Sequence, residues 1–189
     1  MTDSNSMKCN GDDSTLLLID LQTKLMSAMP RKVIDRLKKN SILLLKAASL
    51  LSIPVIVTRQ YPNGLGPVDD EITEMLDENT LQYDKTCFSC ADVDELVDTL
   101  KKNGRKQIIL AGIEAHICVI QTALDLQSSG FRVFVVIDAV ASRHRENYEN
   151  AISRLQQAGI VCINTESVVF EWLQDASHQA FKTLSAMVR

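Results

Sequence analysis

Short apolar runs alternate along the chain with stretches in which apolar side chains recur every three or four residues. The short runs have the length and the apolar character of strands buried on both faces of a sheet. The longer stretches have the period of helices that pack one face against a core. We therefore expect strands at residues 15–19, 55–57, 81–85, 108–110, 133–137 and 160–163. Helices are expected at residues 33–51, 71–77, 93–100, 118–126, 148–155, 168–173 and 180–187.

Strands that are joined by helical crossovers pair in parallel, with helices covering both faces of the sheet. The predicted fold is a three-layer α/β/α domain with a six-stranded, mostly parallel sheet, and we expect the strand order 3-2-1-4-5-6. Residues 14–189 form one domain of ordinary size, and residues 1–13 are expected to be a disordered tail. In such sheets ligands bind at the carboxyl ends of the strands, where the strand order reverses.

Composition narrows the setting and the partners of this domain. The 189-residue chain has a net charge of −4, which gives no general attraction to nucleic acid or acidic lipid. Its five cysteines, an odd number, do not resemble a disulfide framework and favour a reducing compartment. No apolar run approaches the ~20 residues of a membrane span, and residues 1–13 resemble no secretory or mitochondrial signal. We expect a cytoplasmic protein without membrane or nucleic-acid partners.

Residues 106–126 combine a buried strand, a break at Gly112 and a helix, and they place Cys118 near the start of that helix. A thiol at a helix start feels the positive end of the helix dipole, which favours the thiolate. Backbone N–H groups without helical partners point out of the same turn. A nucleophile and an anion site are therefore predicted in one turn. Taken alone, a cysteine in apolar surroundings is more often a packed core residue.

Two other polar residues belong at the same edge of the sheet as Cys118. Asp20 follows the first predicted strand, and Lys85 ends the third. With the order 3-2-1-4-5-6, strands 1 and 4 are neighbours where the order reverses, so that Asp20 and Cys118 flank the crevice. Thiol chemistry needs a base that accepts the proton and a cation that stabilises the thiolate. Asp20, Lys85 and Cys118 supply both.

Three sequence blocks, in this order, resemble the isochorismatase-like cysteine hydrolases. They read Leu17-Leu-Ile-Asp20-Leu-Gln, Asp84-Lys85-Thr-Cys-Phe-Ser89 and Gly112-Ile-Glu-Ala-His-Ile-Cys118-Val. A fourth block, Gln60-Tyr-Pro-Asn-Gly-Leu-Gly-Pro67, is similar to the subgroup called isochorismatase domain-containing proteins. The resemblance covers residues 15–173 and implies the fold of this hydrolase family.

The resemblance also implies a mechanism. Asp20 is the expected base and Lys85 the expected partner of the thiolate, while Cys118 attacks a carbonyl and passes through a thioester. The backbone N–H groups of Glu114 and Cys118 form the implied oxyanion hole. In the family a cis peptide bond precedes the residue that matches Glu114, so we expect a cis bond between Ile113 and Glu114.

Departures from the family pattern limit the substrate and the cofactor. Nicotinamidases of this family carry an Asp-x-His metal cluster where this chain reads Thr58-Arg59-Gln60, so we expect no metal and no other cofactor. Isochorismatases proper cleave a vinyl ether with the aspartate, and several of them lack the cysteine. The cysteine favours hydrolysis of a small amide, imide or related acyl compound and leaves the vinyl-ether reaction of Asp20 open.

Several neighbouring residues are candidates for lining the substrate pocket, each with an ordinary structural alternative. Loops beside the crevice carry four of them, and the fifth lies two residues before Cys118. A solvated arginine, a packed phenylalanine or a histidine on a helix surface would look the same in the sequence. The candidates are Arg59, Gln60, Tyr61, Phe88 and His116.

Three further readings stay open at this stage. Cys87 and Cys90 form a C-x-x-C pair, which without a second cysteine or histidine pair points away from zinc but allows a redox role. The chain could be a non-catalytic interaction protein, although three family blocks argue against it. A ribonuclease activity ranks last, because basic and aromatic residues do not cluster. We expect a small-molecule substrate and a homo-oligomer, either a dimer or a tetramer.

Overall fold

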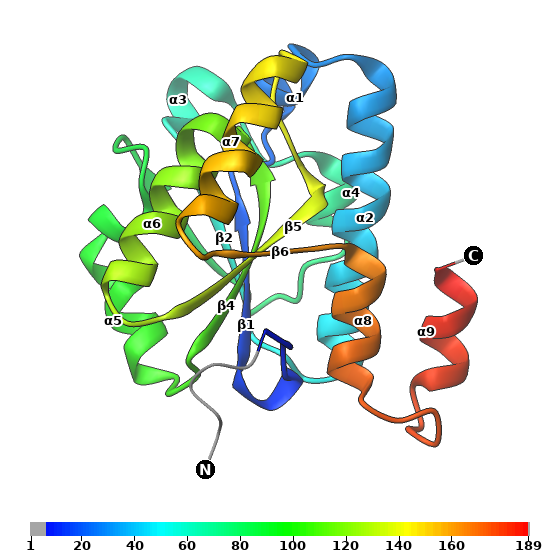
Figure 1. Ribbon diagram of the computed structural model, residues 1–189. Helices are drawn as coiled ribbons and strands as arrows, with labels where there is room; N and C mark the ends of the chain where they lie inside the picture. The colour runs from blue at the N-terminus through cyan, green and yellow to red at the C-terminus, as the bar shows by residue number, and fades with distance from the viewer. Residues whose placement is uncertain (1–6, 189) are drawn as a thin grey trace.

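The computed structural model describes residues 7–188, which fold around one six-stranded sheet (Figure 1). The order β3-β2-β1-β4-β5-β6 and the purely parallel pairing confirm the predicted topology. Strands β1 and β4 are adjacent at the point where the order reverses. The strands are β1 (Ser14–Ile19), β2 (Val55–Gln60), β3 (Leu81–Lys85), β4 (Gln107–Ile113), β5 (Arg132–Ala141) and β6 (Val161–Ile163).

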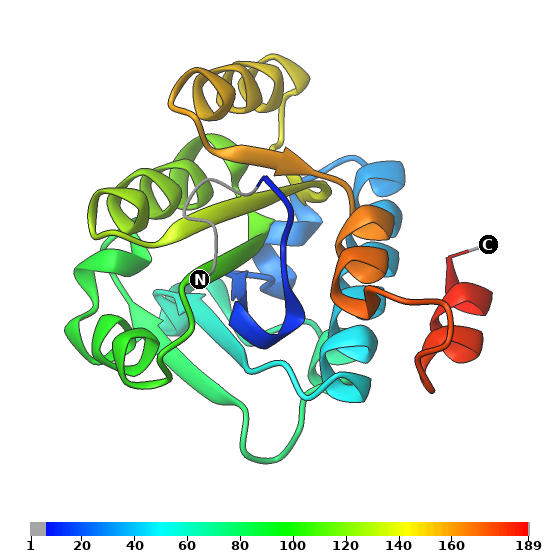
Figure 2. The same ribbon diagram turned by 60° about the horizontal axis from the view of Figure 1, so that its bottom comes forward.

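Helices cover both faces of the sheet, as Figures 1 and 2 show. One face packs against α2 (Arg31–Leu50), α4 (Asp70–Thr73) and α8 (Thr165–Leu173), and α9 (Phe181–Met187) lies outside α8, away from the sheet. The other face packs against α5 (Asp94–Lys102), α6 (Ile120–Ser128) and α7 (Arg145–Gln157). The remaining short elements are α1 (Thr23–Ser27), α3 (Pro62–Leu65), the 3-10 turns η1 (Gly11–Asp13) and η2 (Cys90–Asp92), and the π-helical turn η3 (Ala115–Val119).

Strand β1 shows why the apolar runs form the centre of the sheet. Every residue of β1 is buried. Leu16 and Leu18 belong to the core on the α2 side, whereas Leu17 and Ile19 belong to the core on the α6 side. Alternate side chains of a strand point to opposite faces, so an uninterrupted apolar run is what a central strand between two helical layers requires.

Strand β5 is longer than the apolar pattern indicates, which corrects one expected strand end. The prediction stopped at residue 137 because Asp138 is polar, but β5 continues to Ala141 after a register shift against β4. Asp138 lies inside the strand, and its carboxylate accepts hydrogen bonds from the backbone N–H and the hydroxyl of Thr165, both at 2.8 Å. Asp138 therefore fixes the start of α8.

The amino-terminal segment makes contacts with the domain ahead of the expected boundary at residue 13. Cys9 is fully buried, and its backbone N–H donates to Glu171 at 2.7 Å. The backbone N–H of Asn10 donates to the side chain of Gln107 at 2.7 Å. Residues 7–13 are thus in contact with the domain, and residues 1–6 of the expected tail lie outside the described residues.

Gly112 lets the ends of β1 and β4 approach closely. It pairs with Ile19, and its φ of 122° is a backbone conformation that residues with a side chain rarely adopt. A Cβ atom at this position would lie 2.0 Å from the carbonyl oxygen of Ile19. Because only glycine fits there, Asp20 and the residues after β4 emerge side by side at the carboxyl edge of the sheet.

The helices of residues 7–188 include none that combines the length and the apolar composition needed to cross a membrane. The expectation of a protein without a membrane partner stays a prediction from the sequence. A cytoplasmic location stays a prediction.

Candidate active site

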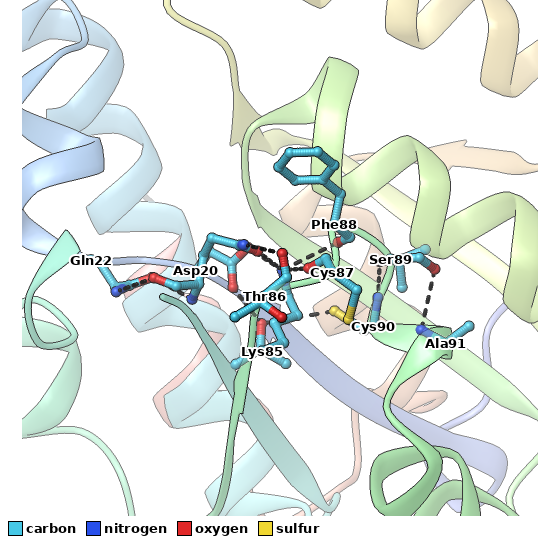
Figure 3. A network of polar contacts seen from close by, with 12 residues as sticks. Asp20, Gln22, Lys85, Thr86, Cys87, Phe88, Ser89, Cys90 and Ala91 are labelled. Carbon is cyan, nitrogen blue, oxygen red and sulfur yellow. Dashed lines mark hydrogen bonds and ion pairs between the residues drawn. The ribbon is translucent and has the colours of Figure 1, made fainter. Parts of the chain in front are cut away.

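A buried ion pair joins two strand ends at the carboxyl edge of the sheet. Asp20 follows β1 directly and Lys85 is the last residue of β3, with β2 between them. The Nζ atom of Lys85 lies 2.7 Å from Oδ2 of Asp20, and neither side chain is exposed (Figure 3). The hydroxyl of Thr58, on β2, donates to the other carboxylate oxygen at 2.7 Å. The parallel order of β1, β2 and β3 therefore assembles the pair from residues far apart in the chain.

Backbone and amide oxygens satisfy the remaining donors of Lys85. Its Nζ atom donates to Oε1 of Gln60 at 2.6 Å and to the carbonyls of Cys87 and Phe88 at 3.3 and 3.2 Å. Burial is the largest single effect and lowers the pKa of Lys85, but the negative charge of Asp20, with smaller contributions from Cys90 and Cys118, raises the pKa above its usual value on balance. The buried amine is therefore a cation.

Cys118 lies in the π-helical turn η3 and is 6% exposed. Burial and, after it, the Asp20 carboxylate raise the pKa of its thiol, and the Lys85 ammonium lowers it; together they bring the pKa from 9.0 to about 12. The structure thus brings Asp20, Lys85 and Cys118 into one electrostatic cluster. It differs from the expectation of a favoured thiolate, because loss of solvation and a neighbouring carboxylate outweigh the helix dipole.

The turn η3 departs from regular α-helical geometry around the thiol. The carbonyl of Glu114 accepts hydrogen bonds from the N–H groups of Ile117 at 3.0 Å and of Val119 at 3.2 Å, the latter a π-type bond. The peptide bond between Ile113 and Glu114 is cis. The Glu114 side chain points to Arg143, whose backbone N–H and Nε atom approach the carboxylate at 2.9 and 3.0 Å.

The five pocket candidates have different surroundings in the structure. Gln60 is bonded to Lys85, whereas Arg59 pairs with Asp84 at 2.6 Å. Tyr61 and Phe88 are each about half exposed, and the Phe88 ring points away from the ion pair in Figure 3. Both are next to Lys85 through the backbone, because Tyr61 N–H donates to the Lys85 carbonyl at 2.8 Å and Phe88 accepts from the ammonium.

His116 contacts the connection between β5 and α7. Its Nδ1 atom lies 3.0 Å from the Ser142 hydroxyl, and its Nε2 atom lies 3.3 Å from the side-chain amide of Asn147. These contacts account for both ring nitrogens of His116 and place them on the β5 side of the turn. A role in the substrate pocket stays a prediction.

Two residues of the cluster were not assigned to the site from the sequence. Cys90 is fully buried, and its thiol lies 3.8 Å from the Thr58 hydroxyl. Burial raises the pKa of Cys90 to about 11, against the effect of Lys85. Gln22 bonds to both backbone polar groups of Gln60. Gln22 follows the first strand by three residues, which is the one signal that could have pointed to it.

Neither a disulfide nor a metal cluster is found within residues 7–188. All five cysteines are free, so the structure holds no Cys87–Cys90 bond, and a redox role for that pair stays untested. No group of three or more histidine, cysteine, aspartate or glutamate side chains could hold a metal ion in this part of the chain. Two of the residues that stand in place of the Asp-x-His metal cluster of nicotinamidases have other partners: Thr58 bonds to Asp20, and Gln60 bonds to Lys85.

Comparison with known proteins identifies the family. The model of the isochorismatase domain matches residues 14–167, which is most of the chain. The chain belongs to the isochorismatase family. Isochorismatase domain-containing protein 2 of Danio rerio is 38% identical over 176 residues, which cover 93% of this chain and 86% of that protein. The resemblance expected from the sequence blocks is confirmed.

Solved structures extend the isochorismatase comparison to the fold. The MAR1 ribonuclease of Caenorhabditis elegans superposes with a TM-score of 0.89 at 39% identity, covering 96% of this chain and 92% of that one. The YcaC protein of Escherichia coli, described as an octameric hydrolase of unknown specificity, has a TM-score of 0.89 at 26% identity, covering 96% and 91%. The isochorismatase fold is therefore confirmed, while relatives differ in the activity that their names give.

Proposed function

We propose that this isochorismatase family member is a metal-independent cysteine hydrolase that acts on a small amide, imide or related acyl compound. The observation that carries the proposal is the buried Asp20–Lys85 ion pair, at 2.7 Å, in electrostatic contact with the Cys118 thiol. A fully buried ion pair loses the solvation of both charges, so it is weak evidence for a role in stability. Perturbed titratable groups of this kind cluster at functional sites.

The proposed reaction starts from a protonated thiol. Asp20 accepts the Cys118 proton while the sulfur attacks the substrate carbonyl carbon, which forms a C–S bond and a tetrahedral intermediate. The N–H groups of Glu114 and Cys118 stabilise its oxyanion. Asp20 then returns the proton to the leaving nitrogen or oxygen as the bond to it breaks, leaving a thioester. Lys85 stays protonated throughout and holds the Asp20 carboxylate in place.

Water completes the cycle. Asp20 takes a proton from the attacking water, the new C–O bond forms, and the carboxylic acid leaves as the C–S bond breaks. The proton on Asp20 goes back to the Cys118 sulfur. Because a free thiolate is disfavoured here, proton transfer and attack must be coupled, which is the condition under which a positioned general base is most effective.

A hydrolysis screen over amides, imides and vinyl ethers tests the proposal. Purified wild-type protein is compared with Cys118→Ala, Asp20→Asn and the control Cys87→Ala, which removes a nearby, partly exposed thiol. We expect hydrolysis of an acyl substrate that Cys118→Ala and Asp20→Asn each reduce by at least about 1,000-fold, with the control unchanged. Activity that survives Cys118→Ala and not Asp20→Asn would replace the thioester mechanism with vinyl-ether cleavage by Asp20.

The alternative of a non-catalytic interaction protein has a separate test that needs no substrate. Lys85 lowers the pKa of the Cys118 thiol, so Lys85→Met should slow the alkylation of Cys118 by iodoacetamide. An alkylation rate that Lys85→Met leaves unchanged would show that Lys85 does not act on the Cys118 thiol, and it would favour an interaction protein.

Ribonuclease activity is a second candidate because of one specific comparison. The C. elegans relative whose name gives this activity is 39% identical and covers nearly the whole chain. The net charge of −4 opposes it, since neutralising phosphates requires clustered cations. Fluorescence anisotropy with a labelled single-stranded RNA separates the two. Binding at 25 mM salt that falls steeply with added salt, together with RNA cleavage lost in Asp20→Asn, would favour the ribonuclease.

A further inference from the structure

Gln60 is held more rigidly than a residue that merely lines a pocket needs to be. It is the last residue of β2 and is 9% exposed. The side-chain amide of Gln22 accepts from the Gln60 backbone N–H at 2.7 Å and donates to the Gln60 carbonyl at 3.0 Å. The same Gln22 nitrogen donates to the carbonyl of Gly66 at 2.7 Å. The backbone that carries the Gln60 side chain is therefore fixed on both sides of its Cα atom.

The orientation of the Gln60 side chain is fixed as well. Its Nε2 atom donates to the carbonyl of Thr86 at 2.8 Å, and its Oε1 atom accepts from the Lys85 ammonium at 2.6 Å. A carbonyl can only accept and an ammonium can only donate. The amide therefore has one arrangement that satisfies both neighbours, with its oxygen toward Lys85.

Gln60 completes the hydrogen bonding of a buried cation without adding a charge. The ammonium of Lys85 has three donors. One goes to Asp20 at 2.7 Å and one to Gln60 at 2.6 Å, which leaves the third for the carbonyls of Cys87 and Phe88 at 3.2–3.3 Å. The bond to Gln60 is the shortest of these. A carboxylate in the place of the amide would compete with Asp20 for the cation.

We propose that Gln60 is a positioning residue that holds the Lys85 ammonium against the Asp20 carboxylate and thereby governs how readily Cys118 gives up its proton. The inference rests on the proposed function, because it assigns Gln60 to the same nucleophile. This role differs from the expectation that Gln60 lines the substrate pocket, which stays a prediction. Gln22 acts one step further out, on the backbone of Gln60.

The test measures the alkylation rate of Cys118 by iodoacetamide at pH 8.5, with peptide mass spectrometry to separate Cys118 from the other thiols. Wild-type protein is compared with Gln60→Met, Gln60→Glu and Lys85→Met. Gln82→Met is the matched control, since Gln82 is an exposed glutamine on the neighbouring strand β3. Gln60→Asn, which keeps the amide but withdraws it from Lys85, serves if the longer variants do not fold. Circular dichroism establishes that each variant is folded.

We expect Gln60→Met and Gln60→Glu to slow alkylation about tenfold, equivalent to one unit of thiol pKa, and Gln82→Met to leave it unchanged. A merely structural role predicts the opposite, because a loosened site exposes the thiol and speeds its alkylation. An unchanged or faster rate in both Gln60 variants would overturn the inference. If Lys85→Met slows alkylation while the Gln60 variants do not, the positioning role fails alone. If Lys85→Met has no effect, the proposed function fails with it.

Discussion

The fully buried carboxylate of Asp20 is bound by two donors, the ammonium of Lys85 on β3 and the hydroxyl of Thr58 on β2. Lys85 approaches one oxygen and the Thr58 hydroxyl the other, each at 2.7 Å. The backbone of Asp20 has a φ of 53°, a left-handed conformation that residues other than glycine seldom adopt. Such strain persists only where the surroundings determine it, and it is concentrated at functional sites.

Thr58→Val tests the second of these donors. Valine keeps the shape of threonine and removes the hydroxyl, so one oxygen of a buried carboxylate loses its hydrogen bond. Hydrogen bonds to charged groups contribute about 1.5–3 kcal/mol, and we expect unfolding in urea to report a loss of that size. The control is Thr183→Val on the exposed surface of α9, for which we expect less than about 0.5 kcal/mol. Equal losses of unfolding free energy in the two variants would argue against a stabilising hydrogen bond between Thr58 and Asp20.

Among the glycines, Gly112 at the junction of β1 and β4 has the closest backbone neighbour for an added Cβ atom. Gly112→Ala would place a Cβ 2.0 Å from the Ile19 carbonyl oxygen, whereas Gly104→Ala has a similarly positive φ and nothing within 4 Å. Gly104→Ala should cost about 1 kcal/mol of unfolding free energy from backbone strain alone. Gly112→Ala should cost at least about 2 kcal/mol more, because β1 and β4 must separate. Urea midpoints measure both, and similar midpoints would contradict the steric argument.

Sequence reasoning reached the elements that a regular pattern specifies and missed those set by distant partners. The parallel sheet between two helical layers followed from the alternation of apolar runs and helical periods, which is a local property of the sequence, whereas the strand order did not follow from that alternation. The end of β5 was placed at residue 137 because Asp138 is polar, but the strand continues by pairing with β4, and the bond to Thr165 satisfies the Asp138 carboxylate. The Gln22–Gln60–Lys85 contacts join residues near the ends of three different strands. Local sequence patterns therefore could not predict them.

The protonation state of Cys118 could not be predicted for a related reason. Its place in a helical turn is legible in the sequence and argues for a lowered pKa. Burial and the position of Asp20 depend on the whole sheet, and these raise the pKa to about 12. The outcome depends on tertiary surroundings, which outweigh the local dipole.

For the whole molecule, buried thiols and the buried ammonium make stability sensitive to alkali. The pKa values of Cys90 and Cys118 are raised from 9.0 to about 11 and 12, and that of Lys85 is also raised. Above pH 9 the unfolded chain loses thiol protons that the folded chain keeps. The unfolded state then binds fewer protons, so the free energy of unfolding falls as pH rises.

We expect urea midpoints to be constant from pH 7 to 8.5 and to fall between pH 9 and 11. Each such thiol contributes a slope of at most about 1.4 kcal/mol per pH unit. Cys90→Ala should fall less steeply than the wild type, with a lower starting stability from the cavity. A midpoint that stays constant to pH 10.5 would contradict the raised pKa values.

Assembly is the other property of the whole molecule that the comparisons bear on. The E. coli relative is described as an octamer, and we propose that this chain also forms a homo-oligomer. Light scattering coupled to size-exclusion chromatography should give a mass that is a multiple of 21.0 kDa. A mass of one chain at micromolar concentration would overturn the proposal, and a mass of eight chains would replace the expected dimer or tetramer.

The protonated, 6% exposed thiol of Cys118 should be resistant to oxidation. Peroxide reacts with solvent-accessible thiolates. A buried, protonated cysteine should therefore resist irreversible oxidation to sulfinic and sulfonic acid. Oxidative damage should fall first on the partly exposed Cys87 and Cys162. Peptide mapping after mild peroxide treatment would then find the catalytic candidate intact while the outer thiols are modified. If the peptides show this pattern, burial of Cys118 protects its thiol from oxidation.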